Sequence, residues 1–490
     1  MTQDDTVVWT AAGGLRGVRR GTVTAWQGVP YAAPPVGPLR FRPPQPVTAW
    51  SGVRPADRFG SAATQSGSLG GSGRRLGSGQ GEDCLYLNVY APAAAATDGR
   101  SRPVLVWVHG GAYTSGSGAL YDGAPLAELG DLVVVTVNYR LGVFGFVNLA
   151  AAVDAEVSSN LGLRDQVAAL EWVRDTIGAF GGDPERVTVA GESAGSVSVS
   201  LLTCAPSARG LFRAAVLESG SYSLIHGPQT SQEIARAYTR RLGIGERDGE
   251  RLWQLPAEQL VATQKEVDRA TPGTVPASPW FDDDVVPASL QEARAAVRPD
   301  LTLLAGSNHD EITLFQRLPG DIMPTRRAEL VSRLRAELGW DAADTLLTHY
   351  PDTAAGTRAL GTDLNFAVPT RLFAERHAAA GGRTYAYRFD ARGPLGATHA
   401  SELVYLWGWS GATALVLRGR ATATRRALAA RMRQHWVSFV RDGAPGAGWP
   451  AFELPERAVQ VFDPAGDHVE RDPERDRRVA WADRDVMPRS

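Results

Sequence analysis

Short, predominantly apolar segments constrain the fold of this chain most. Residues 103–108 (PVLVWV), 132–138 (LVVVTVN) and 187–190 (VTVA) are predicted strands. Strands that are apolar on both faces need helices on both sides of their sheet, and residues 162–180 show a helical pattern between two of them. This alternation predicts an α/β fold with a large, mostly parallel central sheet flanked by helices.

The domain organisation follows from the spacing of the predicted strands. A length of 490 residues would allow about three average domains, but long α/β chains often form one. We expect residues 1–490 to form a single domain, with helical insertions at 225–300 and 312–383 that cap one end of the sheet. Residues 21–59 are rich in Pro and Gly and are predicted to form an extended surface arm with little regular structure.

Composition and charge exclude several classes of function. The net charge of -2 provides no basic field for nucleic acid, and the apolar stretches fall short of the roughly 18–20 residues of a membrane span. The start, MTQDDTVVWT, lacks the pattern of a secretory signal, so we expect a cytoplasmic protein, with secretion by another route left open. Cys84 and Cys204 are too few for a disulfide scaffold or a cysteine-ligated metal site, and we expect free thiols, although one disulfide between them is possible.

A candidate nucleophile lies where the strand at 187–190 runs into a predicted helix. The turn between them is Gly191-Glu192-Ser193-Ala194-Gly195. Small residues two before and two after the serine allow a tight strand-to-helix turn, which lifts the hydroxyl above the sheet and points it at the positive end of the helix. The alternative is a glycine-rich turn with an inert serine.

A candidate oxyanion-binding loop follows the strand at 103–108. Residues 107–113 (WVHGGAY) place small residues where backbone N–H groups can point at a developing negative charge, and the amide of Ala194 supplies a further donor. Consecutive glycines after a strand often mark only a tight turn. Their occurrence together with the serine turn favours the functional interpretation.

A serine nucleophile needs a base, and His399 is the best candidate. It follows the predicted strand 384–389 through a glycine-rich loop, whereas His377 and His435 lie within amphipathic helical patterns. Acidic candidates follow the predicted strand 301–305, and the spacing does not choose between Asp310 and Glu311. The other histidines are His109, His226, His309, His349 and His468.

Several blocks along the chain resemble the type-B carboxylesterase/lipase family of the α/β-hydrolase superfamily, and most of all its bacterial p-nitrobenzyl esterase-like members. They include QGVPYAAPPVGPLRFRPP at 27–44, GEDCLYLNVY at 81–90, NYRLGVFGF at 138–146 and HASELVYLWG at 399–408. The resemblance implies an α/β-hydrolase fold with helical insertions over the active site. It also implies that Cys84 stands at a family disulfide position whose partner is absent here, at residues 60–65.

The same resemblance implies roles for individual residues. It selects Glu311 rather than Asp310 as the acid that orients the histidine, and it supports His399 as the base. The oxyanion amides would be those of Gly111, Ala112 and Ala194; Gly110 would shape their loop, and Glu192 would tune the field around the histidine.

The resulting hypothesis is a serine carboxylesterase that needs no metal or organic cofactor. It would hydrolyse small to medium apolar or aryl esters through an acyl-enzyme intermediate. An amidase or carbamate hydrolase with the same triad and a non-catalytic binding protein of the same fold are the alternatives, and a monomer or a homodimer is equally compatible with the sequence. Five aromatic residues are candidates for an apolar substrate pocket or for the core: Tyr113, Trp280, Phe281, Phe315 and Trp407.

Overall fold

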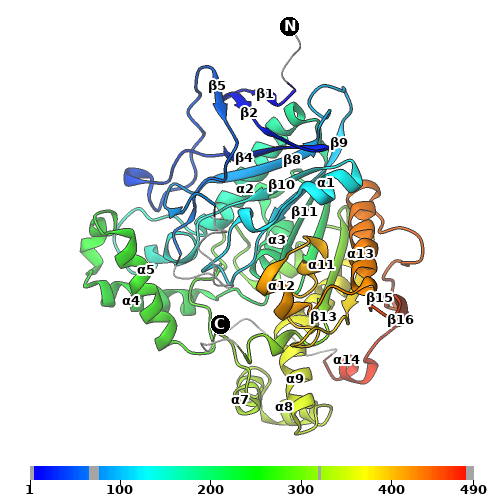
Figure 1. The fold of residues 1–490 in the computed structure, drawn as a ribbon. Coiled ribbons are helices and arrows are strands. Elements are labelled where there is room, and N and C mark those ends of the chain that lie inside the picture. Colours follow the sequence, from blue (N-terminus) through cyan, green and yellow to red (C-terminus); the bar gives the residue numbers. More distant parts are fainter. Residues whose placement is uncertain (1–4, 66–76, 318–321, 482–490) are drawn as a thin grey trace.

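The computed structural model describes residues 5–65, 77–317 and 322–481. Within these residues the main sheet has eleven strands, in the order β16-β15-β14-β13-β12-β11-β9-β10-β8-β4-β3 (Figure 1). The strands are β3 (Val18–Arg20), β4 (Val23–Pro30), β8 (Tyr86–Pro92), β9 (Arg102–Val108), β10 (Val133–Val137), β11 (Gly182–Glu192), β12 (Ala214–Glu218), β13 (Thr302–Asn308), β14 (Thr384–Phe389), β15 (Ala458–Phe462) and β16 (His468–Arg471).

The centre of this sheet is parallel and its margins are antiparallel. Neighbours from β10 to β15 pair in parallel, whereas β8, β4 and β3 on one side and β16 on the other pair antiparallel. The carboxyl ends of the parallel strands therefore meet at one edge, where α/β folds place their ligands. The predicted mostly parallel α/β sheet is confirmed.

One prediction about the N-terminal region is wrong. Val23–Pro30, inside the segment expected to lack regular structure, forms β4 and pairs with β8 about sixty residues further along the chain. Trp26 of this strand is fully buried and packs edge-on against Phe180, with ring centroids 5.1 Å apart. The surrounding Pro and Gly residues favour irregular structure in a local prediction, whereas the strand is stabilised by its distant partner β8.

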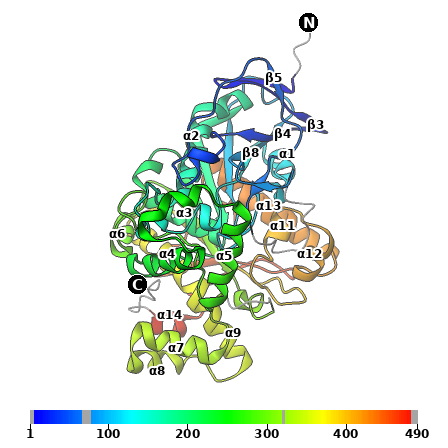
Figure 2. The same cartoon turned by 90° about the vertical axis from the view of Figure 1, so that its left-hand side faces the viewer.

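Helices cover both faces of the sheet, as the uninterrupted apolar strands require (Figure 2). The side chains of successive residues in β9 point alternately to the two faces of the sheet. Val104 and Val106 belong to the core under α2 (Leu161–Thr176) and α3 (Ala194–Cys204), whereas Leu105 and Trp107 belong to the core under α1 (Ala124–Gly130) and α13 (Ala423–Asp442). Every residue of β9 is buried.

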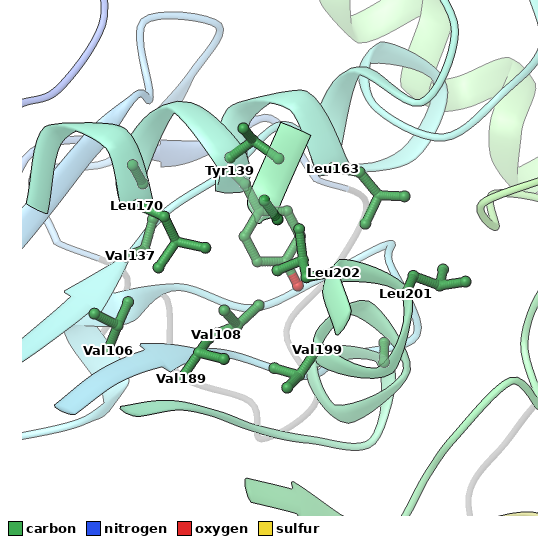
Figure 3. Close-up of a cluster of buried hydrophobic side chains, with 14 of the residues drawn as sticks. Val106, Val108, Val137, Tyr139, Leu163, Leu170, Val189, Val199, Leu201 and Leu202 are labelled. Atoms are coloured by element: carbon green, nitrogen blue, oxygen red, sulfur yellow. The ribbon is translucent and has the colours of Figure 1, made fainter. Parts of the chain in front are cut away.

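The core under α2 and α3 fixes the strands that lead to the site. Figure 3 shows Val106 and Val108 of β9 and Val189 of β11 gathered with Leu170 of α2 and Leu202 of α3. All five are at most 2% exposed. Tight packing on this face holds the ends of β9 and β11 next to each other.

The two regions between strands that were predicted to be helical contain separate groups of helices. Residues 225–300 include α4 (Pro228–Leu242), α5 (Ala257–Ala270) and α6 (Leu290–Ala295). Residues 312–383 include α7 (Arg327–Leu338), α8 (Trp340–Leu347), α9 (Ala354–Thr362) and α10 (Val368–Ala379), and α7 to α9 lie away from α4 and α5 in both views (Figures 1 and 2). α7 to α9 share a small core with Trp481 of α14 (Arg475–Trp481).

Three further observations concern the described residues only. None of their helices is both long enough and apolar enough to cross a membrane. They contain no group of three or more His, Cys, Asp or Glu side chains placed to hold a metal ion. Cys84 and Cys204 are buried free thiols.

Candidate active site

Ser193 lies at a sharp turn between β11 and α3. Its φ of 56° and ψ of -125° lie outside the regions that residues with a side chain commonly adopt. Space requires the glycines on either side: a Cβ on Gly191 would lie 2.5 Å from the carbonyl carbon of Gly195, and a Cβ on Gly195 would lie 2.1 Å from the carbonyl oxygen of Val108. The structure therefore confirms the predicted strand–turn–helix.

The loop after β9 packs directly against this turn. A Cβ on Gly110 would lie 2.6 Å from the carbonyl oxygen of Glu192, and one on Gly111, whose φ is 117°, would lie 2.2 Å from the carbonyl oxygen of Ser115. Ala112 also has a positive φ, of 52°. Strained backbone of this kind persists where the surrounding structure holds it, often at functional sites.

Three backbone N–H groups near Ser193 have no hydrogen-bond partner in the described part of the chain. Among the described residues, the N–H groups of Gly111, Ala112 and Ala194 donate no hydrogen bond. Ala194 is the first residue of α3, where the helix leaves its N–H groups unsatisfied and its dipole is positive. Unpaired donors in a partly or fully buried setting suit an oxygen atom that gains negative charge.

The imidazole of His399 is held between two carboxyl groups and two aromatic rings. Its Nδ1 lies 2.7 Å from Glu311 Oε2. Its Nε2 lies 3.1 Å from Glu192 Oε1, close but without the alignment of a hydrogen bond. The rings of Phe315 and Phe366 pack on it, with centroids 5.0 and 4.7 Å away. Fixing Nδ1 in this way sets the orientation of the ring and leaves Nε2 for proton transfer.

Glu311 is fully buried and receives two further hydrogen bonds. Ser219 Oγ donates to Glu311 Oε1 at 2.6 Å, and the backbone N–H of Asn308 donates to the same oxygen at 2.7 Å. Neither donor was predicted from the sequence to have a role. Both lie at or just beyond the carboxyl ends of the adjacent parallel strands β12 and β13. Their position at this edge of the sheet is the feature of the sequence that could have marked them as site residues.

Asp310 points away from the imidazole of His399. Its Oδ2 accepts a hydrogen bond from the backbone N–H of Ala397 at 3.1 Å, and its Oδ1 lies 3.0 Å from His309 Nδ1. Geometry thus separates the two neighbouring acids that spacing alone did not separate. His377 and His435 lie in α10 and α13, as predicted.

Three buried carboxyl groups have raised pKa values, and one of them, Glu192, contacts the imidazole of His399. Burial, then the charges of Glu311 and Glu218, raise the pKa of Glu192 well above its ordinary value. Burial raises the pKa of Glu218 to about 8, although Trp436 Nε1 donates a hydrogen bond to it at 2.8 Å. Glu402, three residues after His399, has its pKa raised well above the ordinary value, first by burial and then by the charges of the other three carboxylates. Perturbed carboxyl groups concentrate at functional sites.

A cavity of about 1320 Å³, counting its open mouth, contains Ser193 and His399 in its wall. Gly110, Gly111 and Ala112 also line it. The rest of the wall is mainly apolar, with contributions from α11 (Leu403–Leu406) and α12 (Gly411–Leu417). These side chains are Leu120, Tyr121, Leu314, Phe315, Ile322, Leu403, Trp409, Ala412, Thr413, Val416 and Leu417.

The five aromatic candidates divide between this cavity and the core. Phe315 lines the cavity, whereas Tyr113, Trp280, Phe281 and Trp407 are buried elsewhere. Tyr121 and Trp409, which the sequence analysis did not single out, line the cavity and pack on each other, with ring centroids 5.6 Å apart. No local pattern marks them, because their contact joins residues far apart in the chain.

A serine elbow at the carboxyl edge of a mostly parallel sheet, beside a glycine-containing loop, is the arrangement of the serine hydrolases with the α/β-hydrolase fold. Solved structures of esterases share this architecture over nearly the whole chain. The model of the carboxylesterase family matches residues 4–477. The chain therefore belongs to the carboxylesterase family, and it is a carboxylic ester hydrolase.

Relatives in sequence and structure agree with this family. The para-nitrobenzyl esterase of Bacillus subtilis is 35% identical over 487 residues, covering 96% of this chain and 97% of the relative. The fumonisin B1 esterase of Sphingopyxis macrogoltabida is 35% identical over 91% of this chain and 84% of the relative. A PNB esterase structure superposes with a TM-score of 0.88 at 35% identity, covering 97% of this chain and 99% of that chain. A carboxylesterase from Geobacillus stearothermophilus superposes at 0.85 with 38% identity, covering 97% and 100%.

Proposed function

We propose that Ser193, His399 and Glu311 form the catalytic triad of this carboxylesterase. The observation that carries the proposal is the cavity wall itself: a strained serine elbow and an imidazole whose Nδ1 is bound to a buried carboxylate face the same space. Glu311 orients the ring and stabilises its charged form. Ser219 positions that carboxylate from the opposite side.

The backbone N–H groups of Gly111, Ala112 and Ala194 form the oxyanion hole. Their lack of partners among the described residues supports this role. Gly110 keeps the loop close to the serine, since any side chain there would collide with the backbone of Glu192. The carboxyl group of Glu192, 3.1 Å from His399 Nε2, tunes the charge around the imidazole.

The reaction proceeds in two halves. His399 Nε2 takes the proton of the Ser193 hydroxyl as Oγ bonds to the ester carbonyl carbon, and the carbonyl oxygen becomes an oxyanion. The bond to the alkoxy oxygen then breaks, and the departing alcohol takes the proton from His399. In the second half a water molecule gives a proton to His399 and attacks the acyl-enzyme, which releases the acid and returns the proton to Ser193.

The cavity wall supports esters of small to medium apolar or aryl groups as substrates. Its apolar side chains, from Leu314 and Phe315 on one side to Trp409 and Val416 on another, give such groups a place away from water. Relatives named for the hydrolysis of para-nitrobenzyl and fumonisin B1 esters favour an ester bond over the amide or carbamate bond that the sequence left open.

We also propose that residues 1–490 form one domain with helical insertions at 225–300 and 312–383. The continuous eleven-stranded main sheet supports one domain. The second insertion contributes Leu314, Phe315 and Ile322 to the cavity wall, whereas 225–300 contributes no lining residue within the described part of the chain.

The test of the nucleophile is Ser193→Ala, compared with Ser200→Ala. Ser200 lies within α3 and is fully buried, and its hydroxyl donates to the carbonyl oxygen of Val197 at 2.7 Å. We expect Ser193→Ala to abolish turnover of p-nitrophenyl butyrate and labelling by an organophosphonate, with the melting temperature preserved. Ser200→Ala should retain both reactions. Undiminished turnover in the first variant would refute the assignment.

A further inference from the structure

A second cavity lies under α10, on the face of β13, β14 and β15 that meets this helix. Its volume is about 670 Å³, counting the space open to solvent, and among the described residues it shares no lining residue with the cavity at Ser193. It exists because the facing side chains are small. Ala305, Ala386 and Val459 are neighbours across the three strands, and Ala374 of α10 stands opposite.

Four arginines line this cavity, and three of them are neutralised. Each of the three forms a hydrogen-bonded ion pair with a carboxylate, which neutralises its charge. The pairs are Arg388 Nη2 with Asp390 at 2.7 Å, Arg457 Nε with Glu375 at 2.8 Å, and Arg478 Nη2 with Asp472 at 2.8 Å.

Arg371, the fourth, is not matched in this way. Its Nε and Nη2 atoms are buried and form no hydrogen bond with any described residue. The carboxylate paired with it is Glu375, whose Oε1 lies 3.7 Å from Nε and already accepts a hydrogen bond from Arg457. Burial lowers the pKa of Arg371 and the nearby Arg478 lowers it further, whereas the charges of Glu375 and of Asp363, which also lines the cavity, raise it.

The unsatisfied atoms of Arg371 have a specific geometry. Nε and Nη2 form one edge of the guanidinium group, with two parallel N–H donors that match two oxygens of a carboxylate or a phosphate. The preceding residue, Thr370, also lines the cavity, and its buried hydroxyl forms no hydrogen bond with any described residue. The Arg371 side chain is partly exposed, but donor atoms of a cation that are themselves buried and unpaired are costly unless an anion joins them.

We propose that the cavity under α10 is a binding site for a small oxyanion, a carboxylate or a phosphate group. The edge of Arg371 binds two of its oxygens, and Thr370 Oγ donates to the anion. The alanine floor accommodates a short apolar substituent. The site is distinct from the ester-binding cavity and does not depend on the proposed triad.

Isothermal titration calorimetry on the full chain tests this site, with inorganic phosphate and acetate as separate probes at constant ionic strength. We expect saturable binding of at least one probe, and the one that binds identifies the anion class. Arg371→Gln should weaken the binding at least about tenfold, because two charge-assisted hydrogen bonds are lost. Arg58→Gln is the control, since the side chain of Arg58 is 81% exposed and does not line the cavity.

Two further variants separate binding from folding and from catalysis. Arg371→Lys keeps the charge but not the two-donor edge, so it should bind the probe more weakly than the wild type and more tightly than Arg371→Gln. Ser193→Ala should bind the probe as the wild type does, whatever its effect on ester turnover. Saturable binding of neither probe, or equal affinity in the wild type and both Arg371 variants, would overturn the proposal.

Discussion

Replacing Glu311 by Gln tests the triad through the tautomer of His399. Glu311 Oε1 accepts hydrogen bonds from Ser219 and Asn308, while Oε2 lies 2.7 Å from His399 Nδ1. An amide has only one acceptor oxygen, and the two donors on the Oε1 side hold it there. Its NH₂ group then faces Nδ1, which favours the tautomer with the proton on Nε2, and that nitrogen can no longer take the proton of Ser193.

The magnitude follows from this loss of the base. In a triad, a substitution that keeps the shape of the acid but favours the wrong tautomer lowers kcat by about 10⁴. We therefore expect Glu311→Gln to lower kcat by about 10³–10⁴, which corresponds to about 4–5.5 kcal/mol of transition-state stabilisation. Asp310→Asn should change kcat by less than about threefold, because Asp310 is hydrogen-bonded to Ala397 and His309 and not to the imidazole of His399.

The assay is steady-state hydrolysis of p-nitrophenyl butyrate by the wild type and both variants, with melting temperatures recorded as a check on folding. The expected drop is in kcat, with a much smaller change in KM. A larger loss in Asp310→Asn than in Glu311→Gln would refute the reasoning. So would a folded Glu311→Gln enzyme that retains more than about a tenth of the wild-type kcat.

Three further predictions concern the elbow, a buried acid and the cavity. Gly195→Ala should lower the free energy of unfolding by about 3 kcal/mol or more, because its Cβ would lie 2.1 Å from the Val108 carbonyl oxygen. Gly178→Ala, which has open space around it, is the control in urea unfolding, and equal losses in the two variants would contradict the steric argument. The pKa of Glu218 is 4.5 in the unfolded chain and about 8 in the folded protein, so the wild type should lose stability relative to Glu218→Gln as the pH rises between these values. Parallel profiles of unfolding free energy against pH would contradict the raised pKa. Trp409→Ala should raise the ratio of kcat/KM for p-nitrophenyl octanoate to that for the acetate, and an unchanged ratio would remove Trp409 from substrate selection.

The elements of the central sheet were predictable because their signals are local. The apolar runs that became β9, β10 and β11 carry their own burial pattern, and the turn around Ser193 carries glycines that its backbone requires. β4 was missed because its stability comes from β8, a distant partner that local composition does not reveal.

The candidate site divides in the same way. The sequence by itself determined the α/β class, the elbow at Ser193 and the choice of His399, since each depends on residues next to one another in the chain. Residue spacing left Asp310 and Glu311 open, and the family resemblance selected Glu311. Only the tertiary structure places Glu311 against the imidazole of His399, turns Asp310 away, and brings Ser219 to Glu311 and Phe366 to His399. Only the tertiary structure reveals the unpaired Nε and Nη2 atoms of Arg371. Whether an arginine is fully paired depends on residues that are distant in the sequence and close in the fold.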